Sequence, residues 1–564
     1  MALALGSVVA VAATLAVMHL AGLTGVDAAA HAYKTALVVH GQALAWDDLW
    51  YGGSYGVAGY GVVYYLLASV VGETAIVVAA AGLLPLLFHL YVRRAWQVSS
   101  LLPAAALAVV GVVYLANGQN PFLLAMALTM AGLALLAADH PVWAALPVAV
   151  AAFTNPVAVV TGAVFLVAEV VARRAVRRRA ALFAAALCPF VVAWLAVLLA
   201  FRGRVSYLAQ PAELLKWTAV AAVGVVLARL SDDRDRRAKQ ILFGVAAALC
   251  LAAIVVPSQL GNNAARFLAL FGLPALLMIR GVRLPRAATA ALLAAVAAVQ
   301  LAAPVGDLLR VGDAVQTRRS FFAPALAFAA RSYDPDFRYH VVALRLHWEA
   351  CYFPQAGLPI TRGWFRQDDW QHNALLYEKP GPAAYVAWLR DLGVSDVFVP
   401  HAALDMSSTR EASLIARSRA FVKVFDDTGW TVYRLRHPEP LVVAHGPATP
   451  TASPTPPAAV TAMTGTTVAE PASRAATYAT APGAAVTAVT HDTVTVTVRR
   501  AGSYVVKFTW TPYWRLSGPL APGGAPAGSV ASAPGDWTML RAGRAGTYLL
   551  QARPSLRAAL GRIF

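Results

Sequence analysis

Long apolar segments separated by short charged loops occupy the chain up to about residue 304. A helix needs about 20 apolar residues to cross the hydrocarbon core of a membrane, and shorter apolar helices can belong to the same bundle. The pattern predicts a mainly α-helical, multi-pass membrane domain over residues 1–304 with eleven transmembrane helices. The expected helices cover residues 1–23, 73–91, 101–116, 122–138, 142–153, 157–172, 180–201, 214–230, 241–256, 267–279 and 287–304.

The first segment has two interpretations. Small residues at 28–30 would suit the cleavage of a signal peptide, but residues 1–23 lack a charged start and are too long for such a peptide. We therefore expect an uncleaved first transmembrane helix. Further along, Thr154-Asn155-Pro156 predicts a turn between two short helices, because proline breaks a helix.

Positive charges are divided unevenly between the loops. Residues 60–71 are apolar, but counting them as a span would place Arg93 and Arg94 outside, so we expect a helix on the outer surface there. With a cytoplasmic N-terminus, the inner loops hold fifteen basic residues, and the outer loops hold four, with Lys216 just inside a helix. The four are Lys34, Arg202, Arg204 and Arg266. This positive-inside bias places the outer loops and everything after residue 304 on the extracytoplasmic side.

The sequence after the last span changes character. Trp, His and acidic residues appear together in residues 305–440, and the strand patterns at 395–400, 421–425 and 430–433 predict an extracytoplasmic α/β domain. A Thr-, Pro- and Ala-rich stretch centred on 449–471 predicts an extended linker, which we assign to residues 441–475. Alternating patterns at 493–498, 503–510 and 546–550 then predict an all-β, sandwich-like module over residues 476–564.

Composition agrees with a membrane protein. The chain has 564 residues, of which 59% are hydrophobic and only 13% charged, against about 25% charged in an average soluble domain. The net charge of +18 comes mainly from basic residues between apolar segments, so nucleic acid is not an expected partner. The three cysteines do not form a disulfide framework, because two of them lie inside apolar segments.

The stretch that leaves the first span carries an unusual set of polar side chains. Asp27 and His31 are four residues apart, so a helix would place them on one face, with Lys34 one turn further. A carboxylate with an imidazole and an amine beside it suits a general base or a phosphate-facing site. The alternative is that Asp27 caps a surface helix while His31 and Lys34 contact lipid headgroups.

The same loop continues with aromatic and acidic residues: Trp46, Asp47, Asp48, Trp50 and Tyr51. Aromatic rings cover the apolar faces of sugars and carboxylates accept hydrogen bonds from sugar hydroxyls, so this pattern favours sugar or acceptor binding. An interfacial aromatic belt would explain Trp46 and Trp50 equally well. It would not explain Asp47 and Asp48, because such a belt requires no acids.

Taken together, the acid after the first span, the following His-x-Tyr-Lys, the Trp- and Gly-rich loop and the surface helix resemble the GT-C class of membrane glycosyltransferases. The resemblance implies a polyprenyl-phosphate sugar donor and a catalytic carboxylate in the first outer loop, where Asp27 is the matching position. Asp27 stands alone there, whereas several GT-C subfamilies have paired acids, so a divalent metal is possible and its use stays open. The stretches 348–354 and 362–369 also resemble an actinobacterial membrane protein family named as 6-pyruvoyl-tetrahydropterin synthase-related.

Other outward positions could bind donor or acceptor. Arg266, at the outer end of a span, could hold a lipid phosphate, with Arg202 and Arg204 as further phosphate contacts. Asn117 and Gln119 could contact sugar hydroxyls, although a polar turn explains them too. In the α/β domain the densest polar and aromatic cluster could bind the acceptor or form a domain interface; its candidates are Trp348, Glu349, Trp364, Asp368 and Asp369.

These observations predict an inverting membrane glycosyltransferase that moves a sugar from a polyprenyl-phosphate donor to a cell-envelope glycan or glycolipid. Asp27 would be the general base, His31 would orient it or touch the phosphate, and Arg266 with Lys34 would stabilise the leaving phosphate. The alternative is a non-catalytic transporter, lipid-handling or envelope-assembly protein. Transporters usually place ionisable residues near the membrane midplane and often have related halves, and neither pattern is visible in this sequence.

Overall fold

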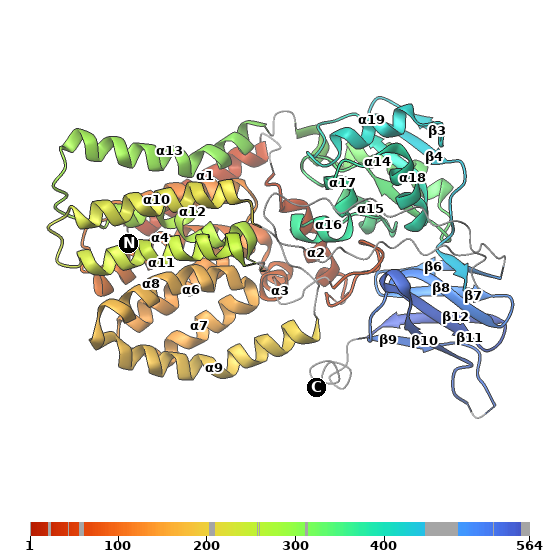
Figure 1. Ribbon diagram of the computed structural model, residues 1–564, viewed down its shortest axis with the longest axis horizontal. Helices are drawn as coiled ribbons and strands as arrows, with labels where there is room; N and C mark the ends of the chain where they lie inside the picture. The colour runs from red at the N-terminus through yellow and green to blue at the C-terminus, as the bar shows by residue number, and fades with distance from the viewer. Residues whose placement is uncertain are drawn as a thin grey trace.

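The computed structural model describes residues 2–20, 24–42, 44–55, 61–201, 209–256, 258, 260–310, 314–445, 483–522 and 524–553. It contains an elongated helical bundle, an α/β domain and a β module, the last two at one end of the bundle (Figure 1). The chain is thus mostly helical, with β-sheets in its C-terminal part.

Each of the apolar segments predicted from the sequence contains a helix of the bundle. Six of these helices are long and apolar enough to cross a membrane, namely α4, α6, α9 with the preceding turn, α10, α11 and α13. The bundle helices are α1 (Ala2–Leu20), α4 (Glu73–Ala95), α5 (Leu102–Ala116), α6 (Asn120–Ala137), α7 (Pro141–Thr154), α8 (Pro156–Ala172), α9 (Arg177–Ala200), α10 (Pro211–Arg229), α11 (Arg236–Val255), α12 (Arg266–Leu276) and α13 (Arg286–Arg310).

The centre of the bundle is held by aromatic packing. Phe165 of α8 contacts Phe88 of α4 and both Phe267 and Phe271 of α12, with ring centroids 5.0–6.0 Å apart. The predicted turn between the two short helices forms at Asn155, whose side chain accepts a hydrogen bond from the Val157 amide and so caps α8.

Two short helices lie between the bundle and the α/β domain: α2 (Ala28–Val39) and α3 (Val62–Val71) (Figure 1). Helix α3 corresponds to the predicted surface helix. Its Tyr64 hydroxyl donates to Glu73 at the start of α4, at 2.8 Å, while Leu66 and Val70 stay exposed. Helix α3 therefore supports α2 from the bundle side.

The α/β domain is built on a four-stranded sheet of order β1-β2-β4-β3. Strands β1 and β2 are parallel and the other pairs are antiparallel, so the chain crosses over between β1 and β2 through helices. The domain contains α14 (Arg319–Ser332), β1 (Arg338–Val341), α15 (Glu349–Gln355), α16 (Arg366–His372), α17 (Ala374–Tyr377), α18 (Pro382–Asp391), β2 (Val394–Pro400), α19 (Thr409–Arg417), β3 (Phe421–Asp426) and β4 (Trp430–Leu435). The strand predictions at 395–400, 421–425 and 430–433 are confirmed.

The β module has two four-stranded antiparallel sheets, β10-β11-β8-β5 and β6-β7-β12-β9, with a shared hydrophobic core. Its strands are β5 (Val442–Ala444), β6 (Ala484–Val489), β7 (Thr493–Val498), β8 (Gly502–Thr509), β9 (Trp514–Ser517), β10 (Gly528–Ser532), β11 (Trp537–Ala542) and β12 (Gly546–Ala552). Strand β5 lies in the stretch that composition assigned to the linker. It pairs with β8, and its two buried valines join two apolar clusters: Val442 lies in the module core, and Val443 lies in the cluster shared with the α/β domain. The Pro- and Thr-rich centre of the expected linker lies outside the described residues.

Candidate functional site

Asp27 occupies the position just before α2, where an aspartate usually caps the helix with its side chain. No such capping hydrogen bond is present at the start of α2. Instead, the Asp27 carboxylate accepts a hydrogen bond from the Trp364 indole of the α/β domain, at 2.9 Å. The two residues are 337 positions apart, so tertiary packing directs this carboxylate away from its own helix.

The charges around Asp27 are positive. Burial raises the pKa of its carboxyl group, while the Trp364 hydrogen bond and the charges of Arg266, His347 and Arg366 lower it. Asp27 is half-buried, so part of the residue is still accessible to solvent. Two arginines beside a single carboxylate do not suit a divalent cation, and no group of three or more His, Cys, Asp or Glu able to hold a metal occurs in the described residues. The possible metal site of the sequence therefore does not fit the residues at Asp27.

Arg266 begins α12 and is held in a defined orientation. Its guanidinium donates to Asn263, at 2.9 Å, and to Gln119. It also lies over the rings of Tyr114 and Phe122, at 5.8 and 5.2 Å from their centroids. Asn117 belongs to the same turn as Gln119. The structure therefore joins Gln119 to Arg266 and places Asp27 within reach of the Arg266 charge, although the sequence placed the three in separate outer loops.

The turn at 117–121 packs directly on the start of α2. A side-chain carbon at Gly25 would overlap backbone atoms of Gly118 and Asn117, and Gly118 itself has a φ of 76°. Only residues without a side chain allow this close approach of two backbones. The contact between these two loops fixes the position of Asp27 relative to Arg266.

His31 does not join Asp27. Its ring is fully buried and its Nδ1 lies 3.0 Å from the Tyr65 hydroxyl of α3. Burial, with the nearby Lys34 charge, lowers the pKa of His31 to about 3, so the ring is neutral at physiological pH. Among the described residues no side-chain hydrogen bond links His31 to Asp27. The His31 ring therefore packs α2 on α3, and its predicted catalytic role stays a prediction.

Lys34 lies among aromatic rings of the first outer loop and the α/β domain. Its ammonium lies 4.7 Å from the centroid of the Phe365 ring and 5.7 Å from that of Trp50. Burial lowers its pKa to about 8, and the charges of Asp368 and Asp47 oppose this shift. Burial likewise raises the pKa of Asp368, where the Lys34 charge acts in the opposite direction. The charges of Lys34 and Asp368 therefore act on each other between α2 and the α/β domain.

The aromatic and acidic residues of the first loop are buried in domain contacts. Trp46 packs in the core of the β module, 5.8 Å from the Trp514 ring, and its indole donates to Asp48 at 2.8 Å. Asp47 lies 3.2 Å from His491 of the β module and accepts from the Leu49 amide. Because Trp46 and Asp48 are at most 2% exposed, a sugar could not reach them in this structure.

Trp50 and Tyr51 contact the α/β domain in the same way. The Trp50 indole donates to the Ala350 carbonyl, at 2.9 Å, and its ring lies against Gly363, where a side chain would collide with it. Tyr51 stacks on His372 with ring centroids 4.5 Å apart. The predicted sugar platform is therefore the surface on which the C-terminal domains pack.

The remaining predicted residues of the α/β domain divide between structural and site contacts. Trp348 donates to Thr24, at 3.0 Å, and Glu349 lies 3.4 Å from His347. Asp369 is fully buried and forms an ion pair with Arg362, which places it inside the domain. Of this group only Trp364 contacts Asp27. Arg202 and Arg204 lie outside the described residues.

Several residues around the site were missed at the sequence level. Asp405 binds Arg366 through both carboxylate oxygens, at 2.8 and 2.7 Å, and Tyr65 and Tyr114 contact His31 and Arg266. The sequence Asp405-Met406-Ser407 has the pattern of an Asx turn, which forms here, since the Ser407 amide donates to Asp405. That pattern predicts a turn and gives no indication of the distant partner.

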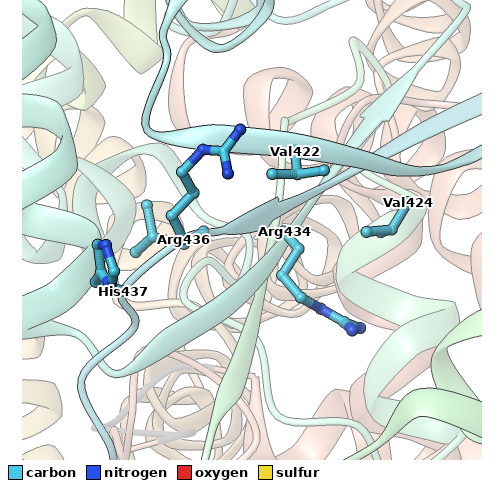
Figure 2. Close-up of a pocket in the computed structure, with 6 residues that line it drawn as sticks. Val422, Val424, Arg434, Arg436 and His437 are labelled. Atoms are coloured by element: carbon cyan, nitrogen blue, oxygen red, sulfur yellow. The ribbon is translucent and has the colours of Figure 1, made fainter.

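A pocket of about 350 Å³ lies elsewhere on the α/β domain, along β3 and β4. It is lined by Val422, Val424, Arg434, Leu435, Arg436 and His437 (Figure 2). The guanidinium groups of Arg434 and Arg436 point away from each other, and Arg434 is paired with Asp396. The pocket contains none of the predicted site residues and its charges do not converge on one ligand.

Comparisons with known proteins give similarity to solved structures only. No family model and no curated protein matches the chain. Arabinofuranosyltransferase AftD from Mycobacteria matches with a TM-score of 0.43 and 16% identity, over 77% of this chain and 40% of AftD. A variant of AftD matches with a TM-score of 0.45 and 15% identity, over 97% of this chain and 60% of the AftD chain. ArnT from Cupriavidus metallidurans, bound to undecaprenyl phosphate, matches with a TM-score of 0.40 and 14% identity. This match covers 75% of this chain and 97% of the ArnT chain. The chain thus spans 40–60% of the length of these AftD chains, and similarity at this level establishes neither a shared fold nor a shared activity.

Replacing Asp48 with asparagine tests the structural role of the first loop. Burial raises the pKa of Asp48 well above its ordinary value of 3.8, so ionisation destabilises the folded state increasingly as the pH rises above that value. The asparagine side chain would keep the acceptor for Trp46 without a buried charge. We expect the free energy of unfolding of Asp48→Asn, measured in detergent at pH 8, to exceed that of wild type by about 1–3 kcal/mol. The difference should disappear below pH about 4. A less stable Asp48→Asn protein at pH 8 would contradict this interpretation.

Proposed function

We propose that this protein is a membrane glycosyltransferase of the GT-C type, which transfers a sugar from a polyprenyl-phosphate donor to a hydroxyl of a cell-envelope glycan or glycolipid. One observation carries the proposal. The Asp27 carboxylate does not cap its own helix but is held by Trp364, within reach of the charge of the anchored Arg266 guanidinium. A base beside a fixed cation is the arrangement that displacement of a sugar from a phosphate requires.

The proposed reaction is a single displacement with inversion at the anomeric carbon of the donor sugar. Asp27 accepts the proton of the acceptor hydroxyl as its oxygen bonds to the anomeric carbon of the donor. The bond from that carbon to the phosphate oxygen breaks, and the lipid phosphate leaves with the bonding electrons. Arg266 stabilises the negative charge on this phosphate, and Gln119 and Asn263 keep the guanidinium in place.

The burial of Asp27 serves this role. A carboxylate in water is a weak base, and burial raises its pKa toward the pH at which it must accept a proton. The neighbouring cations oppose the shift and favour the ionised form of the group. Removing water from the site also strengthens the interaction of Arg266 with a phosphate.

The proposed topology has eleven spans and a cytoplasmic N-terminus, with the α/β domain and the β module on the extracytoplasmic side. The uneven distribution of basic residues between the loops supports this orientation. The Asp27 site is then at the outer membrane surface, where a lipid-linked donor reaches it from the bilayer. A cell-envelope acceptor reaches it from the opposite side.

Turnover of lipid-linked sugars tests the proposal. Purified full-length protein in liposomes would be given a panel of polyprenyl-phosphate sugars with envelope glycan and glycolipid acceptors, and the products measured by mass spectrometry. We expect one donor to be consumed with formation of an elongated acceptor of inverted anomeric configuration. Movement of lipids across the membrane without transfer from any donor would favour the non-catalytic alternative.

Replacing Arg266 with glutamine is expected to raise the donor KM about tenfold, because one charge-assisted contact to the phosphate is lost. A matched control is Arg283→Gln, which removes an exposed arginine paired with Asp232 beyond the other end of α12. Initial rates over a range of donor concentrations measure the effect. Equal KM values for the two variants would show that Arg266 does not bind the donor phosphate.

A further inference from the structure

The Trp364 indole that binds Asp27 is itself held on its ring faces. His347 stacks on it with ring centroids 3.2 Å apart and an interplanar angle of 13°, and the Arg366 guanidinium lies 4.8 Å from its centroid. Such contacts fix the plane of an indole and therefore the direction in which its N–H points. The N–H of Trp364 points at Asp27.

Both groups that hold Trp364 converge on one carboxylate. Asp405 binds the Arg366 fork through its two oxygens, and its Oδ2 lies 3.7 Å from Nε2 of His347. The Arg366 and His347 contacts lower the pKa of Asp405, so it stays ionised at physiological pH. Asp405 is 6% exposed, and His347 has a left-handed backbone with a φ of 55°, which is uncommon for a residue other than glycine.

The loop that carries Trp364 is fixed by the first outer loop. Ile360 pairs with both Trp50 and Tyr339 through single β-bridges, and Gly363 lies against the Trp50 ring. The Trp364 side chain is only 3% exposed. The indole is thus held by contacts within the α/β domain and by Trp50 of the first outer loop, and its N–H meets Asp27 when the α/β domain is docked on the start of α2.

The geometry points to Trp364 as a positioning residue for Asp27, through which the docked α/β domain completes the active site. This inference rests on the proposed function, since it assigns Asp27 the role of base. One carboxylate oxygen receives the indole N–H, which orients the group and leaves the second oxygen for the acceptor hydroxyl. Asp405 acts on the reaction through Trp364, whereas His347 and Arg366 hold the indole ring and also lower the pKa of Asp27 by their charge.

The test compares two tryptophan variants in full-length protein. Trp364→Phe retains a stacking ring and removes the N–H. Trp430→Phe is the control, because the Trp430 indole also donates a buried hydrogen bond, at 2.8 Å to the Phe321 carbonyl, but within the α/β domain. We expect Trp364→Phe to lower kcat about tenfold, with the donor KM unchanged, and to move the acidic limb of the pH profile up by about one unit. The direction follows because the lost N–H favours the ionised carboxylate.

A loss of packing alone would not move the pH profile. The inference is overturned if Trp364→Phe and Trp430→Phe have the same kcat and the same acidic limb while Asp27→Asn is inactive. If Asp27→Asn is fully active, the proposed function fails, and labelling of Asp27 by a carbodiimide, which reacts with protonated carboxyl groups, still tests the hydrogen bond. A higher labelling midpoint pH in Trp364→Phe than in Trp430→Phe supports positioning of Asp27 by the indole, and equal midpoints contradict it.

Discussion

Replacing Asp27 with asparagine is expected to lower the rate of sugar transfer about 1000-fold, because a positioned general base contributes roughly 100- to 10,000-fold to a reaction of this kind. The amide is nearly the same size and keeps an oxygen that can accept the Trp364 N–H, so the fold and the docking of the α/β domain should persist. It cannot accept the proton of the acceptor hydroxyl. Initial rates at saturating donor, together with donor binding measured separately, check the prediction.

The matched control is Asp139→Asn. Asp139 lies in an exposed turn at the far end of α6 with a φ of 64°, a conformation that asparagine adopts as readily as aspartate. We expect this variant to have wild-type rates. Full transfer activity in Asp27→Asn, or an equal loss in both variants, would mean that Asp27 is not the base.

Apolar segments and turn signals determined most of what the sequence revealed about the fold. The helices of the bundle follow from continuous apolar runs, and the break at Asn155 follows from proline chemistry. Strand β7 alternates Thr and Val with period two, and it forms at Thr493–Val498. Strand β5 was missed because three residues next to a Pro-rich stretch carry little local signal, and its strand character depends on pairing with β8.

The candidate site was only partly predictable. Topology placed the loops of Asp27, Gln119 and Arg266 on one side of the membrane domain, and the structure joins Gln119 to Arg266 and places Asp27 within reach of the Arg266 charge. The spacing argument for Asp27 and His31 matches the backbone, because the His31 amide donates to the Asp27 carbonyl four residues before it. The two side chains nevertheless take different partners, Trp364 for Asp27 and Tyr65 for His31.

Aromatic residues with acids have the same sequence pattern at a sugar site and at a buried domain contact. Trp46 and Trp50 are buried against the β module and the α/β domain, respectively. The choice between the two depends on which surface of a distant domain covers the loop, and local sequence does not contain that information. For the same reason Trp364 could not be chosen over the other tryptophans as the partner of Asp27.

Replacing Gly25 with alanine is expected to reduce both stability and activity strongly. The added methyl group would overlap backbone atoms of Gly118 and Asn117, and backbone cannot rotate away as a flexible side chain can. Overpacking of this kind costs about 1–3 kcal/mol of folding free energy or more. The turn that carries Gln119 would move away from α2, and with it the support of Arg266 beside Asp27. We expect transfer to fall about 100-fold or more, since small displacements of reacting groups have effects of this size.

Gly244→Ala in α11 provides the control, because a side-chain carbon there meets no atom within 4 Å. Alanine is favoured over glycine inside a helix by about 0.5–1 kcal/mol, so this variant should be at least as stable as wild type. Thermal unfolding in detergent and initial transfer rates distinguish the two glycines. A Gly25→Ala protein with wild-type Tm and kcat would show that the approach of the two loops does not hold the site together. A protein with wild-type Tm but low kcat would show that the contact positions Asp27 and Arg266 without stabilising the bundle.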